Sequence, residues 1–138
     1  MSSAGIRNCN PFDLEYSGIK WRGLVEKEYK EGELLKFQSS LSGIRAGMLD
    51  AYNKVHKDGL NTIPTFLNKF APPSENDTEK YINFMVNWMG LPWASATIEL
   101  DTTEYLIAWA KGIIQFETGD CRAYNEATYI TAAKEVLG

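Results

Sequence analysis

The stretch that most constrains the fold is DTTEYLIAWAKGIIQFETG, residues 101–119. Its apolar side chains return every third or fourth residue, which predicts an amphipathic helix with one face in the core. Asp101 is expected to cap the start of this helix, with Glu104 completing a capping box, and Gly119 is expected to end it after Thr118. The apolar positions are Leu106, Trp109, Ile113 and Ile114.

Glu117 is the most informative carboxyl on this helix, because it adjoins the apolar face and lies in the last turn. Burial and the negative end of the helix dipole both raise a carboxyl pKa, since both disfavour the charged form. A glycosidase acid must stay protonated near neutral pH to protonate the leaving glycosidic oxygen. Alternatively, Glu117 turns outward or pairs with Lys111 or Arg122, and helical position alone leaves both interpretations open.

From Ser40 onward, the rest of the chain also has helical periodicity, broken by glycine and proline at the expected ends. The expected helices run from Ser40 toward Gly59, from Ile63 to Phe70 behind the cap Asn61–Thr62, from about Ser74 to Gly90, and from Glu126 to Leu137.

The first forty residues differ, because they carry two short strand-like runs, Ile19–Leu24 and Leu34–Gln38, with a turn at Glu31–Gly32. These runs predict a small antiparallel sheet. The expected fold class is therefore α+β and mostly helical, since the strands cluster instead of alternating with helices. No linker divides the chain, so residues 1–138 are expected to form a single domain.

The charge and hydropathy of the chain exclude several function classes. The net charge of −4 and the pI of about 5.0 argue against nucleic-acid binding, which favours a basic face. The longest apolar run, Tyr105–Phe116, is interrupted by Lys111 and is too short to span a bilayer, so no membrane insertion is expected. Residues Met1–Gly5 do not resemble a secretory signal.

The reactive side chains are too few for most catalytic classes. His56 is the only histidine, and Cys9 and Cys121 are the only cysteines and are interpreted as reduced thiols. No Ser-His or Cys-His dyad and no metal-ligand cluster can be assembled, so we expect no metal and no cofactor. A mechanism that uses carboxylates alone is the natural enzyme class.

Five segments, in order, resemble a group of phage endolysins and virion-associated proteins. That group is similar to the lytic transglycosylases of the lysozyme superfamily in a circularly permuted order. The resemblance covers roughly residues 5–137. The segments are GIRNCNP at residues 5–11, WRGL at 21–24, residues 37–45 in the context FxSxxxGIRA, residues 61–78 ending in APPSENDT, and IIQFETG at 113–119.

The resemblance implies a permuted lysozyme-like fold in which Glu117 is the single catalytic glutamate and the N-terminal segment folds back beside it. The chain departs from the group's pattern where Cys9 replaces an asparagine and Phe12-Asp13 replaces Gly-Asn. In the permuted layout Cys9 and Cys121 both lie near the cleft, where a bond between them is conceivable in an oxidising space.

The implied activity is cleavage of the β-1,4 bond between N-acetylmuramic acid and N-acetylglucosamine in peptidoglycan. Glu117 would first act as acid, and then as the base that takes the proton of the C6 hydroxyl, giving a 1,6-anhydro product. The candidates for contacting the glycan strand are Asn8, Asn10 and Gln38 at the N-acetyl groups, and Trp21 and Tyr124 along the groove.

Two alternatives remain open at this point. One is a hydrolytic muramidase in which Asp120 or an unseen acid holds the attacking water. The other is a non-enzymatic virion structural protein that keeps the fold without the activity, which the acidic pI favours. The protein is expected to be a monomer that accumulates in the host cytoplasm and reaches the wall after release, or to be carried in the virion.

Overall fold

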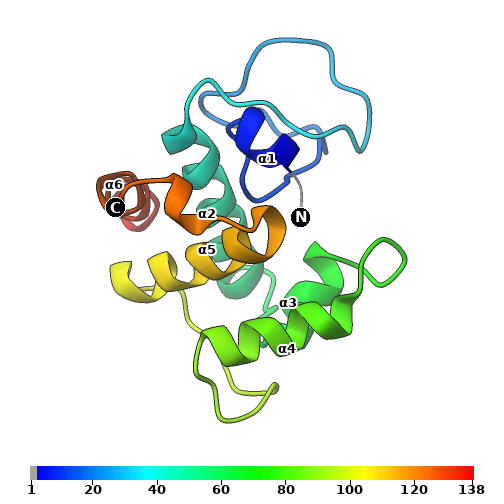
Figure 1. Ribbon diagram of the computed structural model, residues 1–138, viewed down its shortest axis with the longest axis vertical. Helices are drawn as coiled ribbons and strands as arrows, with labels where there is room; N and C mark the ends of the chain where they lie inside the picture. The colour runs from blue at the N-terminus through cyan, green and yellow to red at the C-terminus, as the bar shows by residue number, and fades with distance from the viewer. Residues whose placement is uncertain (1–2) are drawn as a thin grey trace.

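Helix α5, Thr103–Thr118, lies in the middle of the molecule in the computed structural model, which describes residues 3–138 (Figure 1). Helices α2 (Ser40–His56) and α6 (Glu126–Leu137) pack against it and against each other, while α3 (Ile63–Phe70) and α4 (Thr78–Trp88) lie below it in that view. The short helix α1, Ser3–Arg7, lies at the opposite end. Residues 1–2, on which the prediction about a signal segment partly rests, lie outside the described residues.

The mostly helical prediction is confirmed, and several helix boundaries are as expected. The helices α3 and α6 have the predicted limits, and α5 ends at Thr118, followed by Gly119 in the left-handed region at φ 83°. A 3-10 helix, η1, spans Cys121–Ala123. Both α1 and η1 were missed in the sequence, because each is only a turn or so long and carries little periodicity.

The helix starts are set by short polar side chains that accept backbone hydrogen bonds. The Asp101 cap is wrong by one residue: Thr102, with extended backbone, accepts from the amide of Tyr105 at 3.2 Å. At α3, Thr62 forms both halves of a capping box with Thr65. Each such bond satisfies an amide at the first turn that has no partner within the helix, so these residues determine where the helix begins.

The predicted N-terminal antiparallel sheet is wrong. Among residues 3–138 there is no β-strand, and the runs Ile19–Leu24 and Leu34–Gln38 do not form a ladder. The N-terminal part of the chain instead meets itself at two isolated antiparallel bridges. These bridges pair Glu15 with Leu34 and Leu24 with Phe37.

Backbone geometry explains why the ladder fails. Gly18 and Gly23 take φ values of 92° and 77°, which turn the chain where continuous pairing needs extended residues. The amide of Phe37 donates to the carbonyl of Asn8 at 2.9 Å, so it is not available to a neighbouring strand. The residues between become a long loop around the top of the molecule (Figure 1).

Two glycines of α2 bring the N-terminal loop against that helix. A Cβ atom at Gly43 would lie 1.7 Å from the carbonyl oxygen of Cys9, and one at Gly47 would lie 2.2 Å from the ring of Phe12. Residues four apart share a helix face, so the pair forms a shallow track on which the loop docks. Phe12 is buried in the same hydrophobic cluster as α2 and α5, which fixes the next residue, Asp13.

None of the helices in residues 3–138 has both the length and the apolar character needed to cross a membrane.

Candidate active site

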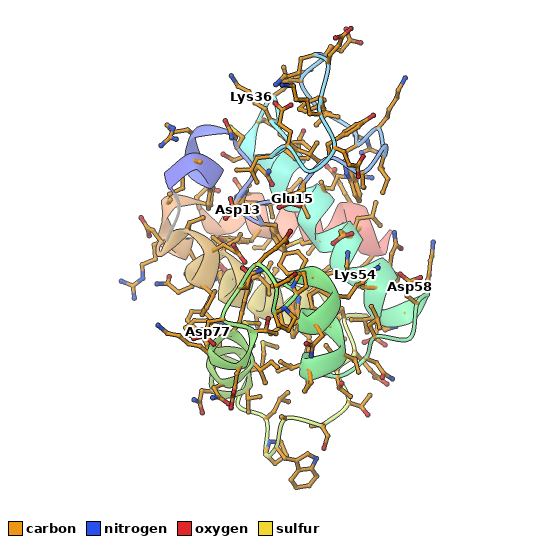
Figure 2. All side chains as sticks on the ribbon, turned by 90° about the vertical axis from the view of Figure 1, so that its right-hand side faces the viewer. Asp13, Glu15, Lys36, Lys54, Asp58 and Asp77 are labelled. Carbon is orange, nitrogen blue, oxygen red and sulfur yellow. The ribbon has the colours of Figure 1, made fainter. Side chains whose placement is uncertain are left out.

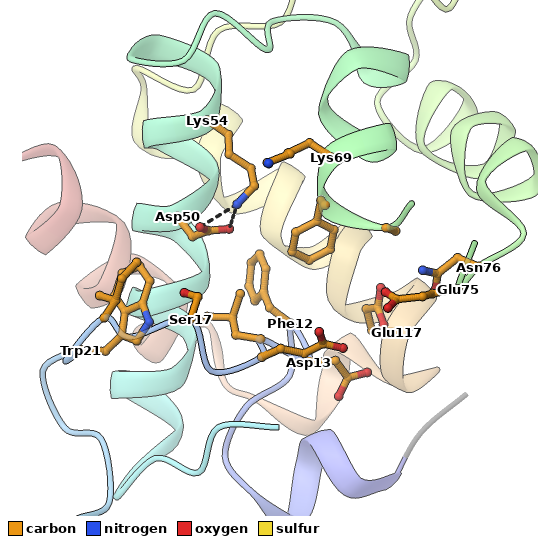
Figure 3. A pocket seen from close by; sticks show the side chains of 15 residues that line it. Phe12, Asp13, Ser17, Trp21, Asp50, Lys54, Lys69, Glu75, Asn76 and Glu117 are labelled. Atoms are coloured by element: carbon orange, nitrogen blue, oxygen red, sulfur yellow. Dashed lines mark hydrogen bonds and ion pairs between the residues drawn. The ribbon is translucent and has the colours of Figure 1, made fainter. Parts of the chain in front are cut away.

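A cleft of about 270 Å³ lies between the N-terminal loop and helices α2, α3 and α5. Glu117 from the last turn of α5 lines one end, together with Asp13 and Glu75, whose side chains gather there in Figure 3. The ion pair of Asp50 and Lys54 lies at the other end. The other lining residues are Phe12, Leu14, Glu15, Ser17, Ile19, Trp21, Lys69, Phe70, Ala71 and Asn76.

The carboxyl of Glu117 is held by Tyr81, a fully buried residue of α4. The Tyr81 hydroxyl donates to Oε2 of Glu117 at 2.7 Å. The Tyr81 ring stacks on Phe116, with ring centroids 3.8 Å apart, so the donor has little freedom to move. Gly119 turns the chain away directly afterwards, which leaves the end of α5 open to the cleft.

The pKa of Glu117 is raised to about 8, and burial is the largest cause. The Tyr81 hydrogen bond opposes this change, because it stabilises the ionised carboxylate and so lowers the pKa. The neighbouring Asp13 carboxyl contributes to the raised value, both through its hydrogen bond to Glu117 and through its charge. At neutral pH, Glu117 is therefore predominantly a protonated acid.

Asp13 is the residue that sequence reasoning missed as a neighbour of Glu117. Its backbone lies in the left-handed region at φ 52°, which aspartate tolerates better than most side chains. Its Oδ1 atom is buried and has no hydrogen-bond partner. Burial raises the pKa of Asp13 above its usual value, while the hydrogen bond with Glu117 lowers it.

The sequence contains little indication that Asp13 and Tyr81 contact Glu117. Asp13 was noted only as a departure from the asparagine of the resembling group, and no local pattern links it to residue 117. Tyr81 lies within the helix expected from about Ser74 to Gly90, and its side chain is fully buried. A buried tyrosine needs a partner for its hydroxyl, which is the signal that could have directed attention to Glu117.

Of the predicted substrate contacts, the structure places only Trp21 in the cleft. Asn10 is fully buried, and its amide oxygen accepts from the amide of Leu14 while its nitrogen donates to the carbonyls of Leu14 and Leu35. Asn10 therefore holds the loop in place instead of facing a ligand, which corrects its predicted role.

The other three candidates are not among the residues that line the cleft. Asn8 is half-buried, and its carbonyl accepts from Phe37. Gln38 is exposed beside that pairing. Tyr124 is half-buried against Tyr129, and burial raises its pKa to about 12.

The alternative partners for Glu117 are not used. Lys111 pairs with Glu126 at 2.6 Å, and no ion pair found among residues 3–138 involves Glu117. Asp120, the expected holder of a hydrolytic water, caps η1 by accepting from Arg122 and does not line the cleft.

The remaining reactive groups stay apart from the cleft chemistry. Cys9 and Cys121 are free thiols, so no disulfide joins them. In the described part of the chain, no three His, Cys, Asp or Glu side chains form a group that could hold a metal ion.

A second set of carboxyls extends the acidic end of the cleft. Figure 2 shows Asp13 and Glu15 side by side near the middle of the molecule. Burial raises the pKa of Glu15, and the charges of Glu75 and Asp13 raise it further. Lys54 is already bound to both oxygens of Asp50 at 2.7 Å, whereas Lys69 is exposed.

No protein-family model matches the chain. The chain is similar to protein P5 of Pseudoalteromonas phage PM2, with 35% identity over 94 residues. The matched residues make up 66% of this chain and 58% of the phage protein. A bacteriophage protein is therefore among its relatives, and the name of that relative states no activity.

Proposed function

We propose that this chain is a phage lytic transglycosylase that cleaves the N-acetylmuramic acid–N-acetylglucosamine bond of peptidoglycan, with Glu117 as its catalytic acid. The observation that carries the proposal is a partly buried carboxyl in a cleft wall, with a pKa of about 8. Helix α5 ends at this position, and its apolar face has no structural need for a carboxyl there. Strongly shifted pKa values in clefts are typical of catalytic groups.

The first step is protonation of the leaving oxygen by Glu117. An acid whose pKa lies near the working pH both holds its proton and releases it readily, which is the condition for efficient general catalysis. After the proton leaves, Glu117 is a carboxylate that only Tyr81 stabilises by a described hydrogen bond. It can then act as the base for the C6 hydroxyl of the same sugar.

The position of Asp13 supports a mechanism that needs one catalytic carboxyl. Two-carboxylate glycosidases hold their acids on either side of the bond, about 5–5.5 Å apart when retaining and about 6.5–9.5 Å apart when inverting. Asp13 instead lies within hydrogen-bonding reach of Glu117, which leaves no room for a sugar between them. It therefore does not serve as the opposing nucleophile.

The cleft has the chemical character of a sugar groove. Trp21 and Phe70 offer aromatic faces to the cleft, and Ser17 and Asn76 offer polar groups. Apolar rings interspersed with a few polar groups are typical of sites that orient a flexible ligand.

The lysozyme-like, circularly permuted fold belongs to the same proposal, supported by the five ordered segments and by the return of the N-terminal loop to Glu117. The phage relative supports a phage origin for the activity. We propose a monomer that is made in the host cytoplasm and meets the wall after release or as a virion component.

The test combines cell lysis with product analysis. Purified protein is added to chloroform-treated Gram-negative cells, and the released muropeptides are identified by mass spectrometry. We expect turbidity loss and 1,6-anhydro ends, and at least a hundredfold loss of both in Glu117→Gln, in line with the contribution of general acid catalysis, about 10²–10⁴. Lysis by Glu117→Gln at the native rate overturns the proposal.

A hydrolytic muramidase is the second candidate, and the carboxyls of Glu15 and Glu75 in the cleft favour it. Either group could hold a water molecule, a role that Asp120 does not have the position to fill. Reducing ends in place of anhydro ends would establish hydrolysis. Absence of both products would instead indicate the non-enzymatic virion protein.

A further inference from the structure

The carboxyls of Asp13 and Glu117 come from opposite ends of the chain and meet at one end of the cleft (Figure 3). The two groups lie within hydrogen-bonding reach of each other. Ionised carboxylates have only acceptor atoms, so two of them in contact require a shared proton. The buried, unpartnered Oδ1 of Asp13 makes a second negative charge there still more costly.

The packing of the loop around Asp13 holds its carboxyl against that of Glu117. Asn10 ties the loop through its bonds to Leu14 and Leu35, and Phe12 is buried against Gly47 of α2. A Cβ atom at Gly5 would lie 2.7 Å from Oδ1 of Asp13, so α1 packs directly against this carboxyl. Asp13 therefore has little freedom to leave Glu117.

We propose that Asp13 is a positioning residue for Glu117: its carboxylate accepts a hydrogen bond from the Glu117 acid in the empty cleft, and this hydrogen bond breaks when a glycan binds, so that Glu117 donates its proton to the glycan. The inference rests on the proposed function. In this role, the hydrogen bond to Asp13 keeps Glu117 protonated and correctly oriented before the substrate binds.

The proton balance of the cycle follows from this contact. The O–H bond of Glu117 breaks, its proton joins the glycosidic oxygen, and the C1–O bond breaks with its electron pair on the leaving oxygen. Glu117 is then a carboxylate beside the carboxylate of Asp13, and the like charge increases its affinity for a proton. As the C6 oxygen bonds to C1, its proton passes to Glu117, which restores the starting state.

The other groups around the pair support this assignment. From α4, Tyr81 occupies Oε2 of Glu117, and its phenol stays neutral because burial and the Glu117 charge raise its pKa. Glu75 and Glu15 add negative charge at the cleft wall. Burial and the charges of Cys9, Asp120 and Asp13 raise the pKa of Tyr124, so its phenol also stays neutral. The five ion pairs described among residues 3–138 include neither Asp13 nor Glu117. The positive charge of the amino terminus lowers the pKa of both carboxyls, but burial outweighs it.

The decisive variant is Asp13→Asn in the full chain, because asparagine has the same shape and tolerates the φ of 52°. Its amide donates a hydrogen bond to Glu117, so it favours the ionised form instead of the acid. The Glu117 carboxyl is titrated by carbon-13 NMR in glutamate-labelled protein, with its signal assigned by its loss in Glu117→Gln. We expect the pKa to fall by about one unit or more, and the alkaline limit of glycan cleavage to fall with it.

Two further variants make the result specific. Asp13→Gly removes the carboxyl without adding a donor and suits a positive φ, so it should lower the Glu117 pKa by less than Asp13→Asn. Asp58→Asn removes the same charge from an exposed residue beyond α2, far from Asp13 in Figure 2, and should leave the titration unchanged.

The outcomes separate this inference from the proposed function. An unchanged Glu117 titration in both Asp13 variants overturns the inference, even where glycan cleavage persists. A lowered pKa in a chain that cleaves no glycan supports the carboxyl pair and overturns only the proposed function. A parallel fall in pKa and in the alkaline limit of cleavage supports both.

Discussion

The Tyr81 hydroxyl donates a 2.7 Å hydrogen bond to Oε2 of Glu117, which joins α4 to the end of α5 inside the cleft wall. This contact opposes the effect of burial, because a donor favours the ionised carboxylate. The pKa of Glu117 thus reflects a balance: burial and Asp13 raise it, whereas the Tyr81 hydrogen bond and the positive charge of the amino terminus lower it.

Replacing Tyr81 with phenylalanine should raise the Glu117 pKa further above about 8, because the only described hydrogen bond that lowers it is lost. The alkaline limit of glycan cleavage should move upward by the same amount. We expect a loss of about 0.5–1.5 kcal/mol in unfolding free energy, typical of one hydrogen bond.

The matched control for this change is Tyr129→Phe. Tyr129 is also buried and donates to the carbonyl of Cys121 at 2.7 Å, but it does not line the cleft. Its loss should lower stability without moving the Glu117 titration measured by carbon-13 NMR. A downward shift in Tyr81→Phe would contradict the assigned direction.

The raised pKa of Glu117 also makes stability depend on pH. The folded-state pKa of Glu117, about 8, lies above the ordinary value of 4.5. The contribution of this group to the free energy of unfolding is therefore complete below pH 4.5 and is lost as the pH rises through 8. Within that window, this group should cost the folded state up to about 1.4 kcal/mol per pH unit.

Glu117→Gln should remove this dependence, because glutamine resembles the protonated acid at every pH. Urea unfolding at pH 5 and pH 8 should show the variant gaining stability over the native chain at the higher pH. Glu104→Gln, at the exposed start of α5, provides the control without such a gain. The same stability difference at both pH values would refute the assignment.

The helices were predictable because their signals are local. The apolar spacing around Trp109, the polar N-cap Thr62 and the left-handed C-cap Gly119 lie within a few residues of the features they determine. The failed sheet shows the limit of such signals. Residues near Phe37 have strand-like composition, but their pairing depends on Asn8, far away in the sequence.

The candidate site divides in the same way. Glu117 was singled out from its place on one helix, and Trp21, predicted to line a glycan groove, lines the cleft, while its contact with a glycan stays a prediction. Asp13 was missed as its partner, because the contact depends on how the loop docks on α2. Asn10 was misjudged for a related reason, since a buried amide that satisfies three loop bonds resembles a ligand contact in sequence.

Because the N-terminal loop packs on α2, we predict that Gly47→Ala will change the environment of Glu117 although Gly47 does not contact that residue. The added methyl would lie 2.2 Å from the ring of Phe12, so the ring or the loop must move. Overpacking of this kind costs about 1–3 kcal/mol. The displaced Asp13 should also lower the Glu117 pKa, as seen by NMR titration.

Gly43→Ala provides a graded comparison for that prediction. Its methyl would lie 1.7 Å from the carbonyl of Cys9, which is backbone and cannot rotate aside as a side chain can. The midpoint temperature of thermal unfolding should therefore be lower for Gly43→Ala than for Gly47→Ala, and lower for both than for the native chain. Native stability in both variants would show that the loop does not depend on this track.

The proposed sugar groove predicts a specific loss in Trp21→Ala. Trp21 is half-buried and lines the cleft, so its removal takes away an aromatic face worth about 0.5–1.5 kcal/mol, or roughly 2- to 13-fold in affinity. Trp93→Ala is the matched control, because Trp93 is 64% exposed and lies outside the cleft lining. Titration of an N-acetylglucosamine oligomer, followed by calorimetry, should show weaker binding in the first variant only. Equal losses in both variants would place the glycan elsewhere on the surface, while the Glu117 titration should stay unchanged in each because neither tryptophan contacts that carboxyl.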